Sequence, residues 1–435
     1  MSQAQPVNGA TDFDVVVVGG GPTGSIASLL LARASMRVAV FERTTKFPLR
    51  VGESLLPRCY ELLQELGLEE RMAQVPHTMK HGARFGFAHE EKLRRVPFTD
   101  GFPLGATMTY NVERAAFDEM LLQAASDAGA EIHRNTLAQL AATPQDGKVE
   151  LKVNDRKITA KYLIDASGRA ALVARELGTR KPLQHLRKLA CFAHYTSVQR
   201  DPGVAAGDLI SLMCEEGWFW LIPIDETRTS IGFVVDVEAE KRLGMTHEAL
   251  LEWAIERAPQ VACRCADAKR VTPVYFMSDF SYTCEPYAGP GYFLAGDCGV
   301  FVDPVFSTGV CLGMMTGKFA AESVSAILRG EMTAEAARQD YTAKFKDSST
   351  IFFRMVNVFY KHSFRELFVN TRNAWRIRRA MISIMAGQIF PTPMPWKLRW
   401  RLRALEVAVK LQRFISLVPR RKTYSLSERA PVGRA

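Results

Sequence analysis

The chain has 435 residues, 47% of them apolar and 23% charged, a composition typical of a folded protein with two or three packed units. It contains no apolar run of the roughly 18 residues that a membrane-spanning helix needs, and it does not start with the basic and apolar stretch of a secretory signal. The eight cysteines and eight histidines are scattered without CxxC or HExxH spacing. We therefore expect reduced thiols in a cytoplasmic protein, no disulfide framework and no metal site.

Charge is distributed unevenly along the chain. In total, 56 Lys and Arg stand against 46 Asp and Glu, a net charge of +10. Residues 351–435 hold 18 of the basic residues and 3 of the acidic ones, which is +15, so the residues before them carry −5. The sequence predicts a mildly acidic body with a strongly basic C-terminal region.

The first predicted elements form a strand, a glycine-rich turn, a helix and a second strand. The β-branched run Asp14–Val18 is typical of a strand buried on both faces, and the apolar stretch Ser25–Ala34 predicts a helix. The second strand, Arg37–Phe41, ends at Glu42. This order is typical of a dinucleotide-binding unit.

The turn between the first strand and the helix carries the spacing Gly19-x-Gly21-x-x-Gly24, followed by Glu42 at the end of the next strand. The first glycine allows a tight turn, the second lets the backbone approach a pyrophosphate, and the third lets helix and strand pack closely. Backbone N–H groups at the helix start would meet the phosphates, and Glu42 could accept hydrogen bonds from a ribose. A glycine-rich surface turn, the alternative, leaves Glu42 unexplained.

Further along the chain the pattern alternates between strands and helices before it becomes helical. The predicted elements are a helix over Ala115–Gly129, short strands within Lys148–Asp165, strand-like runs within Leu189–Val274 including Thr229–Asp236, a helix over His247–Ala258, a buried strand over Tyr292–Ala295, a helix over Val310–Arg329, and mainly helices from Ala334. The nucleotide-binding unit is therefore expected to be split along the chain, with another layer inserted.

Three motifs resemble those of FAD-dependent aromatic hydroxylases. They are LIDASGR at Leu163–Arg169, YFLAGD at Tyr292–Asp297 and VERAAFD at Val112–Asp118. The resemblance implies that Asp297 binds the ribityl chain of FAD, although an aspartate there could also be a helix N-cap, and that Arg114 contacts the flavin. The cofactor-binding residues that it implies are Gly19, Gly21, Pro22, Gly24, Glu42, Arg43, Glu53, Ser54, Arg114, Asp165, Asp297, Pro304 and Gly309.

Two further motifs are similar to the signatures of flavin-dependent halogenases. WFWLIP at Trp218–Pro223 matches WxWxIP, and FVDPVFSTG at Phe301–Gly309 matches FxxPxxSxG. The loop GESLLP at Gly52–Pro57 resembles the family's early loop beside the flavin ring. Two tryptophans and a proline could also belong to an ordinary core strand, but together the motifs resemble this family over roughly residues 12–330.

This resemblance implies an enzyme that uses reduced FAD from a separate flavin reductase, together with O2, to oxidise chloride or bromide to hypohalous acid. Thr308 and Gly309, at the start of the helix, are expected to hold the halide. Lys80 is expected to deliver the oxidant, by hydrogen bonding or as a haloamine, although most lysines lie solvated at the surface. Trp218 and Trp220 would keep the substrate away from the flavin, and the resemblance implies that Ser307 of the second signature is also a catalytic residue.

One position departs from the pattern of tryptophan-type halogenases, which carry a glutamate immediately before the signature serine. Here that position is Phe306, as in relatives that act on phenols or pyrroles. We therefore expect an electron-rich phenolic or pyrrole-like substrate in secondary metabolism, either as a small molecule or on an acyl carrier protein.

The implied fold class is α/β: a three-layer Rossmann-like FAD-binding domain, an inserted β-sheet substrate domain and a helical C-terminal region. The expected domains are residues 11–185 for the first part of the FAD-binding domain with a substrate-side insertion near 78–110, 186–288 for the substrate-domain sheet, 289–345 for the last part of the FAD-binding domain, and 346–435 for the basic helical region. An aromatic hydroxylase or reductase-type enzyme on the same fold, and a non-catalytic flavin-binding protein, are the alternatives.

The basic C-terminal region concentrates its charge in three runs, Trp375–Arg379, Trp396–Arg403 and Arg420–Lys422. Three interpretations stay open: a helical cap with a solvated basic face, a docking surface for an acidic carrier protein, and peripheral contact with an anionic membrane. Nucleic acid is not expected, because no recognition motif accompanies the charge.

Overall fold

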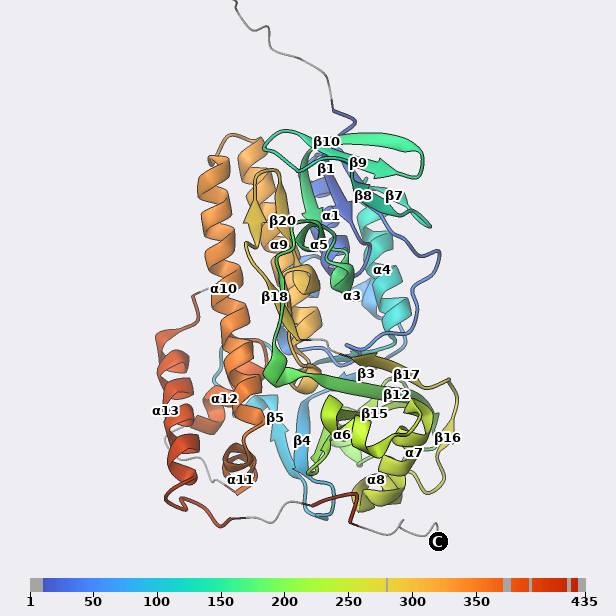
Figure 1. Ribbon diagram of the computed structural model, residues 1–435, viewed down its shortest axis with the longest axis vertical. Helices are drawn as coiled ribbons and strands as arrows, with labels where there is room; N and C mark the ends of the chain where they lie inside the picture. Colours follow the sequence, from blue (N-terminus) through green and yellow to red (C-terminus); the bar gives the residue numbers. More distant parts are fainter. Residues whose placement is uncertain (1–10, 279–280, 371–376, 391–392, 421–423, 429–435) are drawn as a thin grey trace, which may run out of the picture.

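The computed structural model describes residues 11–278, 281–370, 377–390, 393–420 and 424–428. Two large β-sheets lie one above the other in Figure 1, and a column of helices runs along one side of both. This arrangement confirms the predicted α/β class. Trp375, Arg376, Arg421 and Lys422, which belong to the predicted basic runs, lie outside the described residues.

The first sheet has a parallel centre in the order β20-β10-β1-β2-β7, and antiparallel strands at its edges. Its strands are β1 Phe13–Val18, β2 Val38–Phe41, β7 Glu131–His133, β8 Ala138–Leu140, β9 Val149–Val153, β10 Arg156–Asp165, β19 Ala288–Gly289 and β20 Tyr292–Leu294. Val15 and Val17 of β1 pack into one core cluster, whereas Val16 and Val18 pack into another on the opposite face. The strand is therefore buried on both sides, as its β-branched run predicts.

Three helices associated with this sheet lie close to it in Figure 1: α1 Pro22–Arg33, α4 Arg114–Asp127 and α9 Thr308–Leu328. All three begin earlier than expected, α1 at Pro22 instead of Ser25, α4 at Arg114 instead of Ala115, and α9 at Thr308 instead of Val310. In α1 the reason is that proline is well suited to the first helical position, where its missing N–H is not needed.

The second sheet is antiparallel except where β13 runs parallel to β4. Its strands are β4 Gly82–Phe87, β5 Arg94–Pro97, β12 Lys188–Thr196, β13 Leu209–Met213, β14 Gly217–Pro223, β15 Arg228–Asp236, β16 Lys269–Arg270 and β17 Tyr275–Ser278. Along β14, Trp218 and Trp220 face the core shared with the first sheet, whereas Phe219 and Leu221 face the opposite core. This alternation, with a period of two residues, places both tryptophans on the side of the sheet that faces the nucleotide-type unit.

Smaller elements lie between and around the two sheets. The remaining strands are β3 His77–Lys80, β6 Thr109–Val112, β11 Arg180–Pro182, β18 Tyr282–Cys284 and β21 Val300–Phe301; the shorter helices are α2 Pro57–Glu65, α3 Glu69–Met72, α5 Leu172–Glu176, α6 Val237–Leu243, α7 His247–Arg257 and α8 Pro259–Arg264. Single 3₁₀ turns lie at η1 Phe98–Asp100, η2 Gly168–Ala170, η3 Gln184–Leu186, η4 Gly203–Gly207, η5 Gly296–Cys298 and η6 Pro304–Phe306.

The C-terminal helices form the column at the side of the molecule (Figure 1). They are α10 Ala334–Phe359, α11 His362–Asn370, α12 Ile377–Met385 and α13 Trp396–Gln412. The boundary expected between residues 345 and 346 falls inside α10, so one continuous helix joins the body to the basic region. Within the described residues, no helix is long and apolar enough to cross a membrane.

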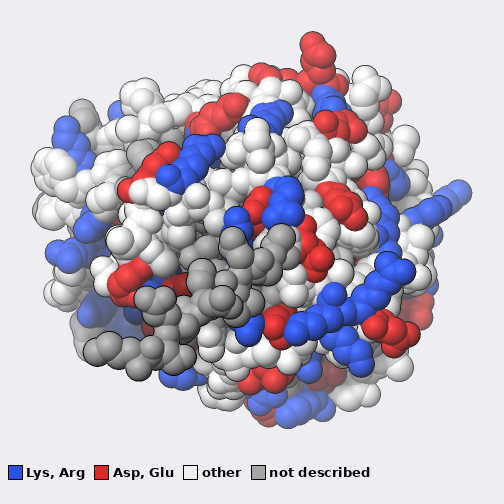
Figure 2. Space-filling model, turned by 90° about the horizontal axis from the view of Figure 1, so that it is seen from above, with Lys and Arg blue, Asp and Glu red and all other residues white. Residues whose placement is uncertain are grey.

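The surface does not show one sign of charge throughout. The face seen from above in Figure 2 carries Lys and Arg side by side with Asp and Glu. The net charge of +10 therefore does not give this face a single sign of charge.

The contact between α1 and β1 depends on two glycines of the turn that joins them. Gly19 has φ +103°, and a Cβ there would lie 2.3 Å from the backbone oxygen of Ala166. A Cβ on Gly24 would lie 1.9 Å from the backbone oxygen of Gly19. The helix can therefore lie against the strand only if position 24 has no side chain.

We predict that Gly24→Val lowers the free energy of unfolding by more than about 3 kcal/mol, because the clash is with backbone that cannot turn aside. Gly21→Val is the matched control, since a Cβ at Gly21 meets no atom within 4 Å and its φ of −68° suits any residue. Thermal unfolding of both variants and the wild type, all as cofactor-free proteins, checks the prediction. Equal melting temperatures would show that the packing argument is wrong.

Candidate active site between the two sheets

A cavity of about 960 Å³ lies between the two sheets and is lined by residues of both. It brings together most of the site residues that the sequence predicts. Those in its wall are Gly19, Gly21, Pro22, Glu42, Arg43, Glu53, Ser54, Arg114, Trp218, Trp220, Asp297, Pro304, Ser307 and Gly309. Gly24, Lys80, Asp165 and Thr308 do not line it.

At one end of the cavity, the glycine turn presents the N-terminus of α1. Glu42 lies at the end of β2, and its carboxylate accepts hydrogen bonds from the backbone N–H of Gly20 (2.8 Å) and from the backbone N–H (2.9 Å) and hydroxyl (2.7 Å) of Thr44. This buried carboxylate therefore holds the glycine turn in place as well as facing the cavity.

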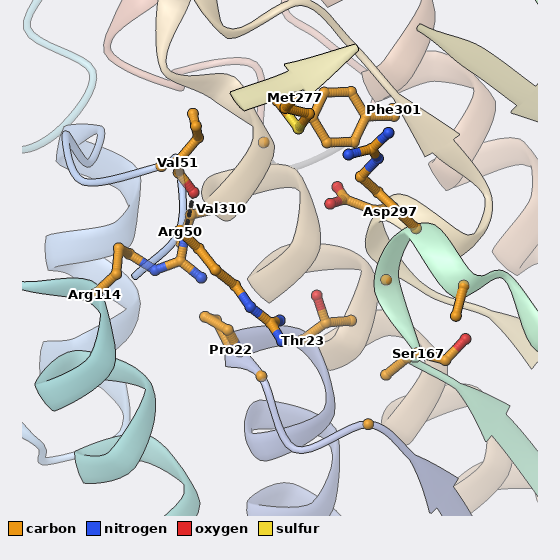
Figure 3. A pocket seen from close by; sticks show the side chains of 18 of the residues that line it. Pro22, Thr23, Arg50, Val51, Arg114, Ser167, Met277, Asp297, Phe301 and Val310 are labelled. Atoms are coloured by element: carbon orange, nitrogen blue, oxygen red, sulfur yellow. Dashed lines mark hydrogen bonds between the residues drawn. The ribbon is translucent and has the colours of Figure 1, made fainter. Parts of the chain in front are cut away.

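Arginines line the cavity near this helix start. Arg114 is bound by Asp118 through two hydrogen bonds of 2.9 Å, and its third nitrogen donates to the backbone oxygen of Val51 at 2.6 Å (Figure 3). Burial opposes the charge of Arg114, but Asp118 keeps the pKa of this guanidinium above its ordinary value. Arg50 extends across the cavity toward Pro22 and Thr23 at the start of α1 (Figure 3). The sequence does not predict Arg50, because it lies just before the GESLLP loop, where no motif marks it.

Asp297 projects into the cavity from η5 (Figure 3). Its backbone oxygen accepts a hydrogen bond of 2.7 Å from the Tyr282 hydroxyl, which fixes the turn. Burial raises the pKa of the Asp297 carboxyl to about 6, although Arg114, Arg169 and Arg50 favour the charged form.

These groups fit a dinucleotide cofactor. The helix N-terminus and Arg50 supply positive potential for phosphates, and Glu42 and Asp297 supply acceptors for sugar hydroxyls. Next to them, the space above Gly21 is open, since a Cβ there would contact nothing within 4 Å. FAD, the cofactor implied by the motifs, therefore fits the residues present.

Gly24 and Asp165, both expected among the cofactor-binding residues, lie behind the cavity wall. Gly24 packs α1 onto the strand, as described above. The Asp165 carboxylate turns away from the cavity and accepts hydrogen bonds from the backbone N–H groups of Ser167 (3.1 Å) and Val173 (2.8 Å). Both residues therefore support the cavity wall without lining it. At the end of β10, the Asp165 side chain points toward α5 and not into the cavity.

The loop of the second signature is joined to distant segments by one tyrosine. Asp303 caps η6 through the N–H of Val305 (3.0 Å) and accepts a hydrogen bond from the Tyr360 hydroxyl at 2.6 Å. The indole N–H of Trp218 donates to the same hydroxyl at 3.0 Å. Sequence reasoning missed Tyr360, which lies just after α10 in a region that shows only helical periodicity. The hydrogen bonds hold the signature loop against the strand that carries both tryptophans.

The start of α9 completes this wall. Ser307 adopts a left-handed conformation (φ 57°, ψ 29°), which turns the chain sharply into the helix. The buried Thr308 hydroxyl has no hydrogen-bond partner in the part of the chain that the structure describes. Phe306 is also buried, with its ring 5.5 Å from that of Phe359, so the position before the serine is apolar.

Lys80 lies at the end of β3 and is only 2% exposed. Its Nζ atom donates to the Ser54 hydroxyl (2.8 Å) and to the backbone oxygen of Leu55 (3.0 Å), and the ring of Phe98 lies 5.4 Å away. Burial lowers the pKa of Lys80 to about 8, against the attraction of Asp208. Lys80 is therefore not a solvated surface lysine; it sits behind Ser54, which itself lines the cavity.

A second buried pair adjoins the same loop. The His194 Nε2 and Glu53 Oε1 atoms are 2.5 Å apart, and both side chains are almost completely buried. His194 lies on β12, far from Glu53 in sequence, and no motif marks it. The pair holds the loop that carries Glu53 and Ser54 against the second sheet.

Comparisons with known proteins agree with this geometry. Residues 12–348 match the FAD binding domain family. A flavin-dependent halogenase of Armillaria mellea is 29% identical over 375 residues, covering 80% of this chain and 74% of that protein. The 1H-pyrrole-2-carbonyl-[peptidyl-carrier protein] brominase of Pseudoalteromonas luteoviolacea is 30% identical over 328 residues, covering 73% and 78%, and the corresponding chlorinase of Pseudomonas fluorescens is 26% identical over 433 residues, covering 94% of each.

Solved structures show the same relationship. The myxobacterial chondrochloren halogenase CndH superposes with a TM-score of 0.75 at 26% identity, over 91% of this chain and 97% of that one. The flavin-dependent brominase Bmp2 shares the fold, with a TM-score of 0.81 at 24% identity over 92% and 100%. The FAD-binding motifs, the cavity that unites them and these relatives together place the chain in the family of flavin-dependent halogenases.

Proposed function

We propose that this halogenase modifies a pyrrole- or phenol-type ring that is carried on an acyl carrier protein. The observation that carries the proposal is Phe306, which puts a buried apolar ring where tryptophan-type relatives have a glutamate. A ring activated by its own nitrogen or oxygen does not need that carboxylate to help remove its proton. Relatives named for pyrrole-2-carbonyl groups on a peptidyl carrier protein support both the ring type and the carrier.

The proposed cofactor residues are those in the cavity wall. Gly19, Gly21 and Pro22 at the start of α1 bind the pyrophosphate together with Arg50; the sugar hydroxyls are bound by Glu42 and Asp297. The other proposed wall contacts are Arg43, Glu53, Ser54, Arg114, Pro304 and Gly309. Reduced FAD, when bound, would give two electrons to O2, and the halide would give two more, so that halide, O2 and protons yield hypohalous acid and water. A separate flavin reductase provides the reduced cofactor.

The start of α9 is the proposed halide site. Its first backbone N–H groups, at Thr308 and Gly309, are not used inside the helix and carry the positive end of its dipole. The unpartnered Thr308 hydroxyl adds a donor close to them. An anion bound here lies next to the cavity, because Ser307 and Gly309 both line it.

Lys80 is the proposed carrier of the oxidant. As a neutral amine it has two N–H groups, which are those donated to Ser54 and Leu55, and its lone pair is left to react with hypohalous acid. The nitrogen takes the halogen from hypohalous acid, and the hydroxide leaves with one amine proton as water. The halogen then passes from the nitrogen to the ring, and the ring proton returns to the amine. Trp218 and Trp220 form the cavity wall from β14 and keep the ring from entering the flavin site.

The proposed division of labour follows the expected domains, with residues 11–185 and 289–345 holding FAD and 186–288 supplying the wall on the substrate side. We also place the enzyme in the cytoplasm, since all eight cysteines are free thiols.

Gly21→Val should fold as the wild type does but lose FAD, because its side chain would occupy the open space where the pyrophosphate approaches. The absorbance of the purified protein near the flavin bands measures the retained cofactor. A variant that kept its full flavin content would contradict the proposed position of the pyrophosphate.

The Lys80→Ala variant should still bind FAD, and NADH consumption in an assay with a flavin reductase should not change. The rate of halogenation should fall by at least about a hundredfold. Lys80→Arg should not restore it, since guanidinium keeps its proton. In the wild type, halogenation should increase as pH rises through about 8, where the Lys80 amine loses its proton. A rate that falls through this pH would assign the ammonium form, and unchanged product from Lys80→Ala would remove Lys80 from the mechanism.

The substrate is tested by incubating the enzyme with FAD, NADH, a flavin reductase and either bromide or chloride. The panel is pyrrole-2-carbonyl and hydroxybenzoyl groups on a carrier protein, the same acids free, and free tryptophan. Mass spectrometry should show halogen in place of hydrogen on the carrier-bound rings and none on tryptophan. A product with an added oxygen, or oxygen consumption sustained by NADPH without a reductase, would instead indicate a hydroxylase.

A further inference from the structure

The outward side of α13 is apolar although it faces solvent. Seven of the fifteen strongly exposed large apolar side chains in the described residues lie within residues 396–417. They are Trp396, Trp400, Val407, Leu411, Phe414, Ile415 and Leu417. We call these seven residues the outer face.

The four members within α13 form a stripe. Trp396, Trp400, Val407 and Leu411 are spaced so that, at 3.6 residues per turn, they fall within about 60° of the helix circumference. Just after the helix, Phe414 and Ile415 are 80% and 62% exposed, so the stripe ends in a protruding apolar tip.

The outer face is not needed to hold the helix in place. The opposite side of α13 packs Leu398, Leu402, Leu405 and Val409 into the main core. Glu406 adds an ion pair to Arg354 of α10 at 2.8 Å. α13 therefore has two apolar sides, one that stabilises the fold and one that the fold leaves exposed at the edge of the helical column (Figure 1).

The charges around the outer face have one sign. Residues 393–420 contain seven basic residues and a single acid, Glu406, which is already paired with Arg354. The basic side chains exposed around the outer face are Lys397, Arg403, Lys410, Arg413 and Arg420. A partner for this surface must therefore be anionic and able to cover apolar tips.

We propose that the outer face docks the enzyme on an anionic lipid surface. Aromatic and aliphatic side chains that protrude singly, with 49–80% exposure for Trp396, Trp400, Phe414 and Ile415, match the headgroup and upper acyl region of a bilayer. Such a surface accepts protruding tips of any shape, and its anionic lipids attract the surrounding Lys and Arg side chains. A folded acidic carrier protein would need a complementary pocket for each tip, so the high exposure of the individual side chains favours lipid.

The proposal does not depend on the identity of the aromatic substrate. It places the enzyme beside a membrane, where α13 lies in the plane of the interface. The outer face includes neither Lys80 nor any residue that lines the cavity. Docking and halogenation can therefore be tested separately.

The test is co-sedimentation of the full-length holoenzyme with vesicles of phosphatidylcholine containing about 30% phosphatidylglycerol, compared with pure phosphatidylcholine. The wild type should bind the anionic vesicles, with weaker binding at high salt and a blue shift of tryptophan emission. The variant Phe414→Ser/Ile415→Ser and the variant Lys397→Gln/Arg403→Gln/Lys410→Gln should each bind at least about tenfold more weakly. Trp396→Gln/Trp400→Gln should lose the emission shift.

Matched controls come from elsewhere on the surface. Val204→Ser removes an apolar side chain that is 63% exposed, and Lys181→Gln removes an exposed lysine, both far in sequence from the outer face. Both controls should sediment as the wild type does, and every variant should keep its flavin, its melting temperature and its activity without vesicles. The proposal is wrong if the wild type does not bind the vesicles, or if the controls lose as much binding as the outer-face variants. It is also wrong if the outer-face variants lose binding to a holo carrier protein but keep binding to vesicles.

Discussion

The cavity depends on one buried hydrogen-bond chain, Trp218–Tyr360–Asp303. It joins a strand of the second sheet, the end of α10 and the signature loop, which are far apart in the sequence. Asp303 is fully buried, and burial raises the pKa of its carboxyl to about 6, so its hydrogen bonds to Tyr360 and to the N–H of Val305 offset a large desolvation cost. If the end of α10 moved, this carboxyl would lose a partner, and if β14 moved, the Tyr360 hydroxyl would lose the indole N–H of Trp218. The loop that leads into α9 is therefore held in one position relative to the tryptophan wall.

A second constraint separates the two halves of the proposed chemistry. Ser54 and the neighbouring residues of its loop line the cavity. The Ser54 hydroxyl accepts a hydrogen bond from Lys80, which lies on the side of the loop away from the cavity. The same loop is held from the other side by Glu53 and His194. In the proposed mechanism, the oxidant would form on one side of this loop and meet the Lys80 amine on the other. Because Lys80 is buried, its pKa lies near 8 instead of near 10.5, and the neutral amine becomes available close to physiological pH.

The sequence predicts local features of this site well and long-range ones poorly. The glycine spacing, β1 with its two buried faces, and the order of elements around Glu42 and Asp297 follow from short-range patterns, and the structure has them within a few residues. Asp165 was expected in the cavity because its motif places it at a strand end, but sequence does not reveal which way a carboxylate turns. His194 and Tyr360 were missed for a related reason. Each acts through a partner more than fifty residues away, and nothing in its own neighbourhood marks it.

The excess of positive charge in the C-terminal region has two different roles in the structure. Some of it points inward: Arg354 pairs with Glu406, Arg378 with Asp100, and Arg365 donates to the backbone oxygen of Cys214. The first contact joins two helices of the column, and the other two fasten the column to the body. The charges of these arginines are therefore already used within the chain. The charge that remains exposed gathers around the outer face of α13, beside apolar side chains that the core does not use. One apolar side and a few ion pairs are enough to attach a helix to the rest of the protein. α13 carries a second apolar side, and exposed Lys and Arg side chains surround it. That excess over what folding requires is the physical reason to assign this surface to a partner outside the chain.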